Sequence, residues 1–301
     1  MNPFEKEVLK DNQVNTLHLR YFDIDYPSGS VEPEPVSPIS INISIEPYRI
    51  IPVVFIKNRV FERLNSAGVR DMAMNILSFV TQINNTHKIQ ANEIQFDCDW
   101  TEKTKSRYFL FIEEYRALSK NRISATIRLH QVKFHQITGI PPVDYGVLMY
   151  YNMGEINTGN TNSIYEKSVA ERYNSFIQSY PLALDVALPI FIWGLQIREG
   201  KVFQLLNKMN FSHFEKDSNF ISIKKNWFSV KHGCFKGGYY FQEFDLIKIE
   251  NISAANLFEI VDQINRNSNH NIRNLLFYDL DSVNISQYEK DIFQKIVRRL
   301  D

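Results

Sequence analysis

Short apolar runs typical of β-strands alternate with segments of helical period along most of the chain, and this alternation constrains the fold most strongly. Because helical crossovers return the chain to the same end of a sheet, the pattern predicts a parallel sheet covered by helices. Eight strands are expected, at residues 17–25, 50–57, 92–100, 123–130, 144–152, 185–194, 245–250 and 274–281.

The segments between these strands carry the apolar spacing of amphipathic helices. The clearest example is residues 69–83, whose apolar side chains fall on one helical stripe. Further helices are expected after Thr101 and after Ser253, which are both residue types that cap helix N-termini. Residues 164–177 and 288–300 complete the set.

Strand followed by helix, repeated around eight strands, predicts an α/β fold in which residues 1–301 form a single (β/α)8 TIM-barrel domain. The alternative is an open, doubly wound sheet. That fold would require a glycine-rich phosphate loop after the first strand, and residues 25–28 contain no glycine.

Two segments depart from the repeat. Residues 26–48 hold five of the eleven prolines, so an extended loop is expected there in place of the first helix. Residues 211–244 contain short runs of alternating polarity, which predict a β-hairpin insertion before strand seven.

Composition excludes several classes of protein. The 34 basic residues balance 34 acidic ones, which argues against a polybasic nucleic-acid binder. Two cysteines are too few for a disulfide scaffold and lack the spacing of a zinc site. No apolar run approaches the roughly 18 residues of a membrane helix, and residues 1–13 lack the apolar core of a signal peptide. Two locations stay open: the cytoplasm, or the periplasm or cell surface for a mature chain whose signal has been removed.

The third predicted strand carries the strongest candidate for chemistry. Strict alternation puts Asp97 and Asp99 on one face and the apolar Phe96, Cys98 and Trp100 on the other, which must meet the helices. The aspartates then point into the barrel mouth, roughly 7 Å apart at Cβ, where each raises the cost of ionising the other. The alternative is a structural role in capping and ion pairs.

Several motifs resemble those of chitinase-type glycoside hydrolases, which are TIM barrels. Residues 96–100 (FDCDW) resemble the Asp-x-Asp-Trp core of the family's signature strand, and residues 148–152 (LMYYN) are similar to its Met-x-Tyr-Asp strand end. Residues 189–193 (PIFIW) are similar to the Pro-x-Tyr/Phe strand that follows. Residues 21–25 (YFDID) and 277–281 (FYDLD) further resemble a little-characterised bacterial branch of that group.

The sequence departs from the family pattern at two positions. The family's catalytic Glu, two residues after the last Asp, is replaced by Thr101, and the Asp after the tyrosine is replaced by Asn152. The resemblance implies a mechanism in which the substrate's acetamido group attacks while Asp99 orients it and Tyr151 hydrogen-bonds to it. The acid must then come from elsewhere.

Candidates for that acid are Asp99 itself, Glu155 on the loop after strand five, and Asp281 after the last strand. The catalytic set predicted from the sequence is Asp97, Asp99 and Glu155.

The predicted substrate-binding set consists of polar and aromatic residues near the strand ends. Arg128 and His130 share the inward face of strand four, where a satisfied polar network is the alternative interpretation. Aromatic side chains in such positions can stack on sugar rings, whereas most other aromatics of the chain belong to the core. The set comprises Asp23, Asp25, Arg128, His130, Tyr150, Tyr151, Trp193, Tyr278 and Asp281.

The sequence therefore predicts a glycoside hydrolase acting on a polysaccharide or glycoconjugate, with a carbohydrate ligand, no cofactor and no metal. One alternative is a carbohydrate-binding barrel that has lost catalysis with its Glu. The other is a metal-dependent hydrolase using Asp97, Asp99 and His130, a donor set that suits manganese or zinc.

Overall fold

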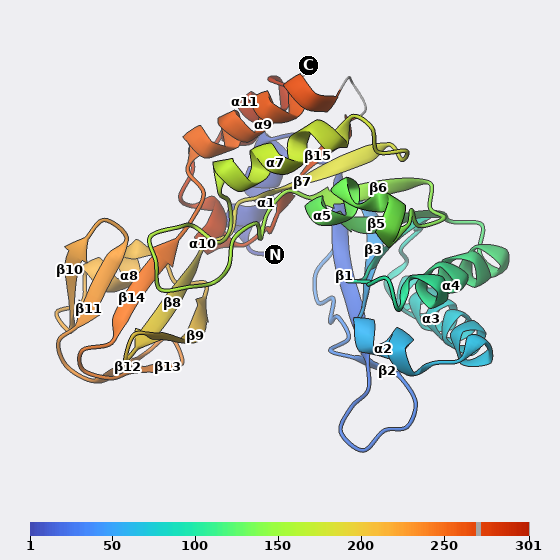
Figure 1. The fold of residues 1–301 in the computed structure, drawn as a ribbon, viewed down its shortest axis with the longest axis horizontal. Helices are drawn as coiled ribbons and strands as arrows, with labels where there is room; N and C mark the ends of the chain where they lie inside the picture. The colour runs from blue at the N-terminus through green and yellow to red at the C-terminus, as the bar shows by residue number, and fades with distance from the viewer. Residues whose placement is uncertain (269–271, 301) are drawn as a thin grey trace.

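A parallel β-sheet forms the centre of the computed structural model, which describes residues 1–268 and 272–300 (Figure 1). Its strands lie in the order β15-β7-β6-β5-β4-β3-β1-β2. Apart from the antiparallel edge strand β2, neighbours follow chain order and pair in parallel, as in a singly wound barrel. The strands are β1 (Thr16–Asp25), β2 (Glu34–Val36), β3 (Arg49–Ile56), β4 (Glu93–Asp97), β5 (Arg122–Arg128), β6 (Tyr145–Met149), β7 (Leu184–Pro189) and β15 (Ile272–Tyr278).

Helices connect these strands as the periodicity predicts, and residues 26–48 form the predicted extended loop with only β2 in it. Asn65 caps the longest helix, α3, by accepting a hydrogen bond from Gly68 N. The last predicted helix is shorter than expected. The helices are α2 (Asn58–Arg63), α3 (Ser66–His87), α4 (Lys105–Leu118), α5 (Leu129–Lys133), α6 (His135–Thr138), α7 (Lys167–Ile177), α9 (Ala254–Ser268), α10 (Ser282–Ile285) and α11 (Ile292–Val297).

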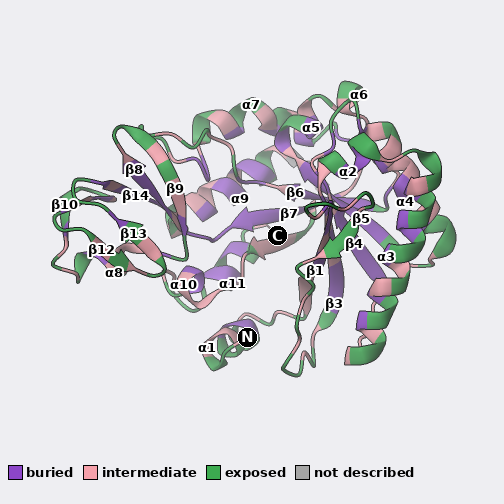
Figure 2. Ribbon diagram, turned by 90° about the horizontal axis from the view of Figure 1, so that it is seen from below, coloured by how far each residue is buried: buried purple, intermediate pink, exposed green. Residues whose placement is uncertain are grey.

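The main core lies between the sheet and these helices. Phe96 of β4 packs edge-on against Phe111 and Tyr115 of α4, with ring centroids 4.8 and 4.9 Å apart. Figure 2 shows the central strands buried, whereas α3 and α4 alternate buried and exposed residues. The outward face of β4 is therefore apolar and covered, which leaves its polar face directed to the other side of the sheet.

A second, antiparallel sheet lies between β7 and α9 in the chain and has its own apolar core. Its strand order is β10-β11-β14-β8-β9, and a separate hairpin pairs β12 with β13. The elements are β8 (Trp193–Arg198), β9 (Lys201–Asn207), α8 (Phe211–Glu215), β10 (Phe220–Lys224), β11 (Trp227–Val230), β12 (Cys234–Lys236), β13 (Tyr239–Phe241) and β14 (Leu246–Glu250).

Two sequence predictions about this region were wrong. The expected seventh barrel strand, residues 245–250, is β14, which pairs antiparallel with β8 and β11. The insertion is longer than the predicted hairpin over 211–244, because its strands run from Trp193 to Glu250. An apolar five-residue run fits a buried strand of either sheet, and only its distant pairing partner decides between them.

The N-terminal helix α1 (Pro3–Asp11) packs against the C-terminal helices. Glu5 accepts a hydrogen bond from the Ser282 hydroxyl at 2.8 Å, and Lys290 pairs with Glu7 at 2.7 Å. Within residues 1–268 and 272–300 no hydrogen-bonded ladder joins β15 to β1. Contacts between α1 and the C-terminal segment therefore bring the two ends of the parallel sheet together.

In the described part of the chain, no helix combines the length and the apolar character required for a membrane span.

Candidate active site

β4 lies between β3 and β5 in the sheet, and its polar face contacts side chains of β1 and β5. Gln95 donates a hydrogen bond to the Thr126 hydroxyl of β5 at 2.9 Å and contacts the His18 ring of β1 at 2.7 Å. Since side chains alternate along a strand, Glu93 and Asp97 share this face with Gln95. The alternation predicted for this strand is observed, and Asp97 ends it.

Asp97 is the most unusual carboxyl group of this face. Its Oδ1 atom is buried and has no hydrogen-bond partner. Burial, and then the nearby charge of Asp99, raise the pKa of Asp97 to about 6, against the opposing effects of Arg128, Thr126 and Arg20. A carboxyl group with this pKa keeps a proton available in mildly acidic solution.

Asp99 differs from Asp97 in exposure and in pairing. Its side chain is 46% exposed and forms an ion pair with the guanidinium Nε of Arg128. His130 lies on α5, where the protein atoms around its ring and then the charge of Arg128 lower its pKa, although part of the residue remains accessible to solvent. Asp99 is therefore a half-exposed carboxylate held by a cation, next to the Asp97 carboxyl with its buried oxygen.

Arg20 and Asp23 lie on β1 on the other side of β4. The Arg20 guanidinium holds the Asp23 carboxylate with two contacts of 2.6 Å and lies over the Phe55 ring at 4.9 Å. Burial raises the pKa of both Asp97 and Tyr278, and the charge of Arg20 opposes each rise. Arg20 thus contributes positive charge to the same region as Arg128.

Four aromatic rings, which we call the aromatic row, extend from this region toward the second sheet. Tyr151 and Tyr278 stack in parallel, with centroids 5.4 Å apart and planes 4° apart. Phe191 lies 5.6 Å from Tyr151 and 5.2 Å from Trp193. Tyr151 and Phe191 are buried, whereas Tyr278 is 48% exposed and Trp193 is half-buried. The exposed ring of Tyr278 is a surface on which a sugar can stack.

The structure brings together five of the predicted residues. Burial of Tyr151 raises its pKa, and the charges of Asp97 and Arg128 also act on it. Asp97 acts on the pKa of Tyr278 as well. Asp97, Asp99, Arg128, Tyr151 and Tyr278 thus form one electrostatically connected group at the carboxyl ends of β4, β5, β6 and β15.

Three other predicted residues have structural partners instead. Tyr150 is fully buried and donates a hydrogen bond to Asn174 of α7, so the prediction that it offers a sugar platform was wrong. Neighbours in an extended segment point to opposite sides, and Tyr151 takes the inward one. Asp25 is buried between Lys57 and Arg59, which lower its pKa. Asp281 caps α10 and pairs with Lys208 at 2.7 Å.

Three loop residues are exposed: Glu155, which is a candidate acid, and Thr101 and Asn152, which replace acidic residues of the family pattern. Glu155 lies on the loop after β6, and Asn152 on the same loop has a φ of 55°. Thr101 has a side chain exposed to solvent and contacts the Thr104 hydroxyl at 3.2 Å, in the turn that begins α4. Thr101 therefore stabilises a turn and supplies no acid.

Among the side chains described, no three or more His, Cys, Asp or Glu residues converge as a metal-binding cluster. Asp97, Asp99 and His130 do not form such a set.

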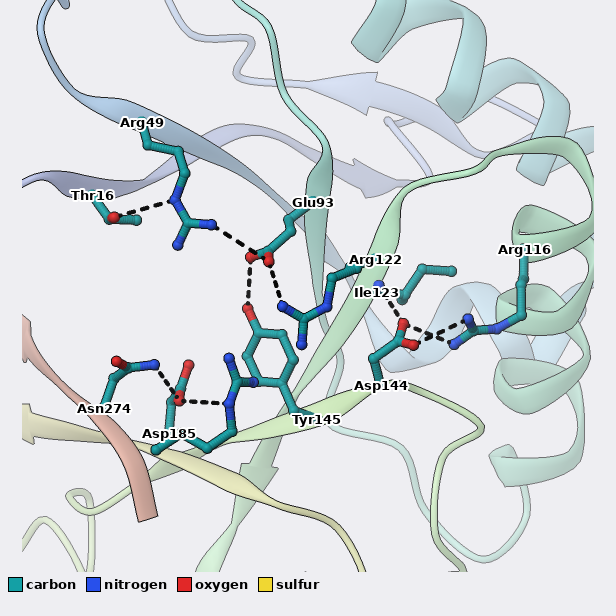
Figure 3. A network of polar contacts seen from close by, with 11 residues as sticks. Thr16, Arg49, Glu93, Arg116, Arg122, Ile123, Asp144, Tyr145, Asp185 and Asn274 are labelled. Atoms are coloured by element: carbon teal, nitrogen blue, oxygen red, sulfur yellow. Dashed lines mark hydrogen bonds and ion pairs between the residues drawn. The ribbon is translucent and has the colours of Figure 1, made fainter. Parts of the chain in front are cut away.

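The same polar face has a second cluster, at the amino ends of the strands (Figure 3). The buried Glu93 carboxylate pairs with Arg122 at 2.9 Å and Arg49 at 3.5 Å and accepts a hydrogen bond from Tyr145 at 3.2 Å. The sequence interpretation missed this cluster. Its signal was the register of Glu93 with Asp97, together with an arginine at the start of each neighbouring strand.

Phe191 was also missed as a member of the aromatic row. Its spacing of two residues from Trp193, at the end of a predicted strand, could have indicated a shared side.

Comparison of the fold with solved structures identifies its class. The spore cortex-lytic enzyme of Bacillus cereus has a TM-score of 0.59 at 11% identity, covering 100% of this chain and 71% of that one. A GH18 chitinase from Cycas revoluta in complex with (GlcNAc)3 has a TM-score of 0.56 at 11% identity, covering 98% and 95%. A putative sporulation-specific glycosylase from Bacillus subtilis has a TM-score of 0.51 at 10% identity, covering 88% and 93%.

No family model matches the sequence, and no curated protein matches it. The chain has the TIM-barrel-like α/β fold of chitinase-type glycoside hydrolases, which confirms the fold class predicted from the sequence.

Proposed function

We propose that the protein binds a polysaccharide or glycoconjugate at the carboxyl ends of the parallel strands and hydrolyses a glycosidic bond there. Asp97 is the general acid in this proposal. The observation that carries it is the buried Asp97 Oδ1 atom without a hydrogen-bond partner, next to the ion-paired Asp99. This burial raises the pKa of Asp97 to about 6. Two carboxyl groups whose environments separate their protonation states are the recurring acid and base arrangement of such sites.

The proposed reaction uses these groups in a defined order. Asp97 gives its proton to the leaving glycosidic oxygen as the bond from that oxygen to the anomeric carbon breaks. The Asp99 carboxylate stabilises the positive charge that develops on the sugar or orients an acetamido group that attacks the anomeric carbon. Water then adds its hydroxyl to that carbon, and its proton returns to Asp97. Tyr278 offers the ring on which the sugar stacks.

A second candidate function is carbohydrate binding without turnover. The observation that favours it is Thr101, which occupies the position of the expected Glu and is hydrogen-bonded into the turn before α4. In that case Asp97 and Asp99 hold sugar hydroxyls and no bond is cleaved.

The test is a panel of polysaccharides and oligosaccharides, assayed for both reducing-end release and thermal stabilisation of the protein. Turnover is expected to fall above about pH 6 and to drop at least about a hundredfold in Asp97→Asn. Asp262→Asn, at an exposed ion pair on α9, is the matched control and should keep full activity. A wild type with neither turnover nor ligand-dependent stabilisation contradicts both candidates.

Thr101→Glu separates the two candidates. If the protein binds sugars without turnover, this substitution places an acid at the family's catalytic position and creates measurable hydrolysis. If Asp97 already serves as the acid, the substitution changes the pH profile of an existing activity.

A further inference from the structure

Phe244, in the second sheet's loop before β14, is exposed in a backbone conformation that a bulky residue rarely adopts. The residue is 79% exposed, and its φ of 71° lies in the left-handed region. It is the third residue of the hydrogen-bonded turn 242–245, where a positive φ usually selects Gly or Asn. A phenylalanine there adds backbone strain and gains little from burial of its ring. Folding alone therefore does not explain this residue.

A buried ion pair holds the turn in this conformation. The buried Asp245 carboxylate contacts the Arg198 guanidinium at 2.9 and 2.8 Å and accepts a hydrogen bond from Gln242 N at 2.7 Å. Phe244 N donates to the Val230 carbonyl at 2.9 Å. These bonds fix the backbone on both sides of Phe244, which is how a strained conformation persists in a folded protein.

A groove of about 400 Å³ lies between the end of β8 and this turn. Its apolar lining includes Phe244, Leu246 and the buried Ile197. The groove begins at the opposite end of β8 from Trp193, about 16 Å away along the strand, since each residue advances a strand by about 3.3 Å. It is therefore separate from the candidate active site.

The charges of the groove favour a cation. Among the described residues, its lining carries three carboxylates, on Glu199, Glu243 and Asp245, and one guanidinium, on Arg198. Since Arg198 and Asp245 neutralise each other, the exposed Glu199 and Glu243 leave an excess of two negative charges. A cation bound there is attracted by both carboxylates and can lie against the Phe244 ring.

Further exposed aromatic rings lie beside the groove. Phe203 is the extra residue of a bulge in β9, a feature that redirects a side chain, and its ring centroid lies 4.1 Å from the Arg198 guanidinium. The rings of Phe235 and Tyr240 are exposed, 4.9 Å apart. Gln196 donates to the Tyr240 carbonyl at 3.0 Å and to the buried carboxylate of the turn at 2.6 Å. The apolar surface therefore extends beyond the groove itself.

We propose that this groove is a docking site for a lysine or arginine side chain on a segment of a partner protein. Glu199 and Glu243 attract the charged end of that side chain, and the Phe244 ring and the apolar lining contact its aliphatic stem. The neighbouring rings contact the residues that flank it. Exposed aromatic and arginine side chains are typical of protein interfaces, whereas a small amine would not need this wider apolar surface.

The first experiment needs no ligand. Phe244→Asn and Phe244→Gly remove the ring and introduce residue types that tolerate a positive φ. The folding equilibrium constant, from urea denaturation, is expected to stay the same or to rise by up to about tenfold, because strain is relieved and little buried surface is lost. A fall in this constant shows that the ring stabilises the fold, and it overturns the proposal.

The second experiment uses three heptapeptide libraries, with lysine or arginine, methionine, or glutamate fixed at the central position. The basic library is expected to change the amide chemical shifts of residues 197–200 and 242–246 in the isotope-labelled protein. Its apparent dissociation constant should be at least about tenfold lower than that of the methionine and glutamate libraries. Spermidine, a small amine, should also bind at least about tenfold more weakly than the basic library.

Matched substitutions test the groove itself. Phe244→Asn and the double variant Glu199→Gln/Glu243→Gln are each expected to weaken binding of the basic library about tenfold. Glu215→Gln removes an exposed carboxylate at the end of α8, outside the groove lining, and is the control. It should change the dissociation constant less than about twofold.

The proposal is overturned if the basic library shifts no amide of the groove, or if the three libraries bind equally. A loss in Glu215→Gln equal to that in the double variant shows a general attraction to acidic surface and overturns it as well. Spermidine binding as tight as that of the basic library overturns the assignment of a protein partner. Glycan turnover is a separate readout, so the proposed hydrolysis can stand or fail independently of these results.

Discussion

The two ends of the polar face of β4 hold carboxyl groups in opposite conditions. At the amino end, Glu93 is nearly inaccessible and has two arginines and a tyrosine as partners. At the carboxyl end, Asp97 has a buried oxygen without a hydrogen-bond partner and a pKa of about 6. The residues are four apart on one face of one strand, so the difference comes from their neighbours.

This contrast indicates where the strand stabilises the fold and where it is available for chemistry. A carboxylate whose charge is fully compensated contributes to folding and has no capacity left for a ligand. An unpartnered, partly protonated carboxyl costs folding free energy and is the kind of group found at reaction centres. In barrels of this class the carboxyl ends of the strands are the active face.

The largest change in the free energy of unfolding is expected when Asp97 is substituted. Because its pKa is raised from 3.8 to about 6, the folded protein keeps a proton that the unfolded chain releases, so the free energy of unfolding falls as pH rises through that window. Asp97→Asn removes this loss and should be more stable than the wild type near pH 8, by up to about 3 kcal/mol, and no more stable near pH 4. Urea denaturation at both pH values measures this.

A gain in stability that is equal at the two pH values contradicts the raised pKa. If the same variant also loses turnover while its fold stays intact, the carboxyl group that lowers the stability of the wild type is also the one that the proposed hydrolysis requires.

Glu93→Gln is expected to change the free energy of unfolding in the opposite direction to Asp97→Asn, by destabilising the protein. The amide cannot compensate Arg49 and Arg122, so the variant should lose about 2 kcal/mol near neutral pH through weakened charged hydrogen bonds. Denaturant midpoints give the change, and binding of any active glycan should be unaffected. If both amide substitutions change stability with the same sign, the contrast between the two ends is not electrostatic.

Arg128→Met should move the pKa of Asp97 further in the direction in which burial already shifts it. Arg128 lowers the pKa of Asp97, so its removal is expected to raise that pKa by about one unit. Carbon-13 NMR titration of the Asp97 carboxyl measures the shift. Arg20→Met is the matched comparison, and a smaller upward shift is expected because Arg20 has the weaker effect on Asp97.

Asp185→Asn should have the smallest effect. Asp185 is a further buried carboxyl group, near the amino end of β7 and beside the Glu93 cluster (Figure 3). Burial raises its pKa, with Arg273 3.9 Å away and Asn274 donating at 2.9 Å. Its charge is therefore only partly compensated, and the substitution should change stability by less than about 1 kcal/mol near neutral pH. A loss as large as that of Glu93→Gln would show that the whole cluster acts as one unit.

Local periodicity accounts for what the sequence predicted well. The alternation around Asp97 and Asp99 decides which side of the strand each residue takes, and that choice needs only neighbouring residues. The stripe over residues 69–83 likewise identifies α3 without knowledge of its partners. Both features depend on backbone geometry alone.

Pairing between distant segments explains what the sequence did not reveal. The β-type pattern of residues 245–250 fits a strand of either sheet, and their place in the second sheet depends on pairing with β8 and β11. Asp25 ends β1 as Asp97 ends β4, and Asp281 lies three residues after the end of β15. These two carboxylates form ion pairs with Arg59 and Lys208. Glu250 pairs with Lys248 two residues earlier, but its hydrogen-bond donors Trp193 and Ser163 are 57 and 87 residues away, which the sequence does not reveal.

Contacts between α1 and the last helices have a consequence for biosynthesis. The hydrogen bonds that join Glu5 to Ser282 and Asn12 to Lys290 span 277 and 278 residues. Closing so long a loop is slow and entropically costly compared with forming local turns. During translation, α1 cannot form these contacts until residues 282–290 have been synthesised and have left the ribosome.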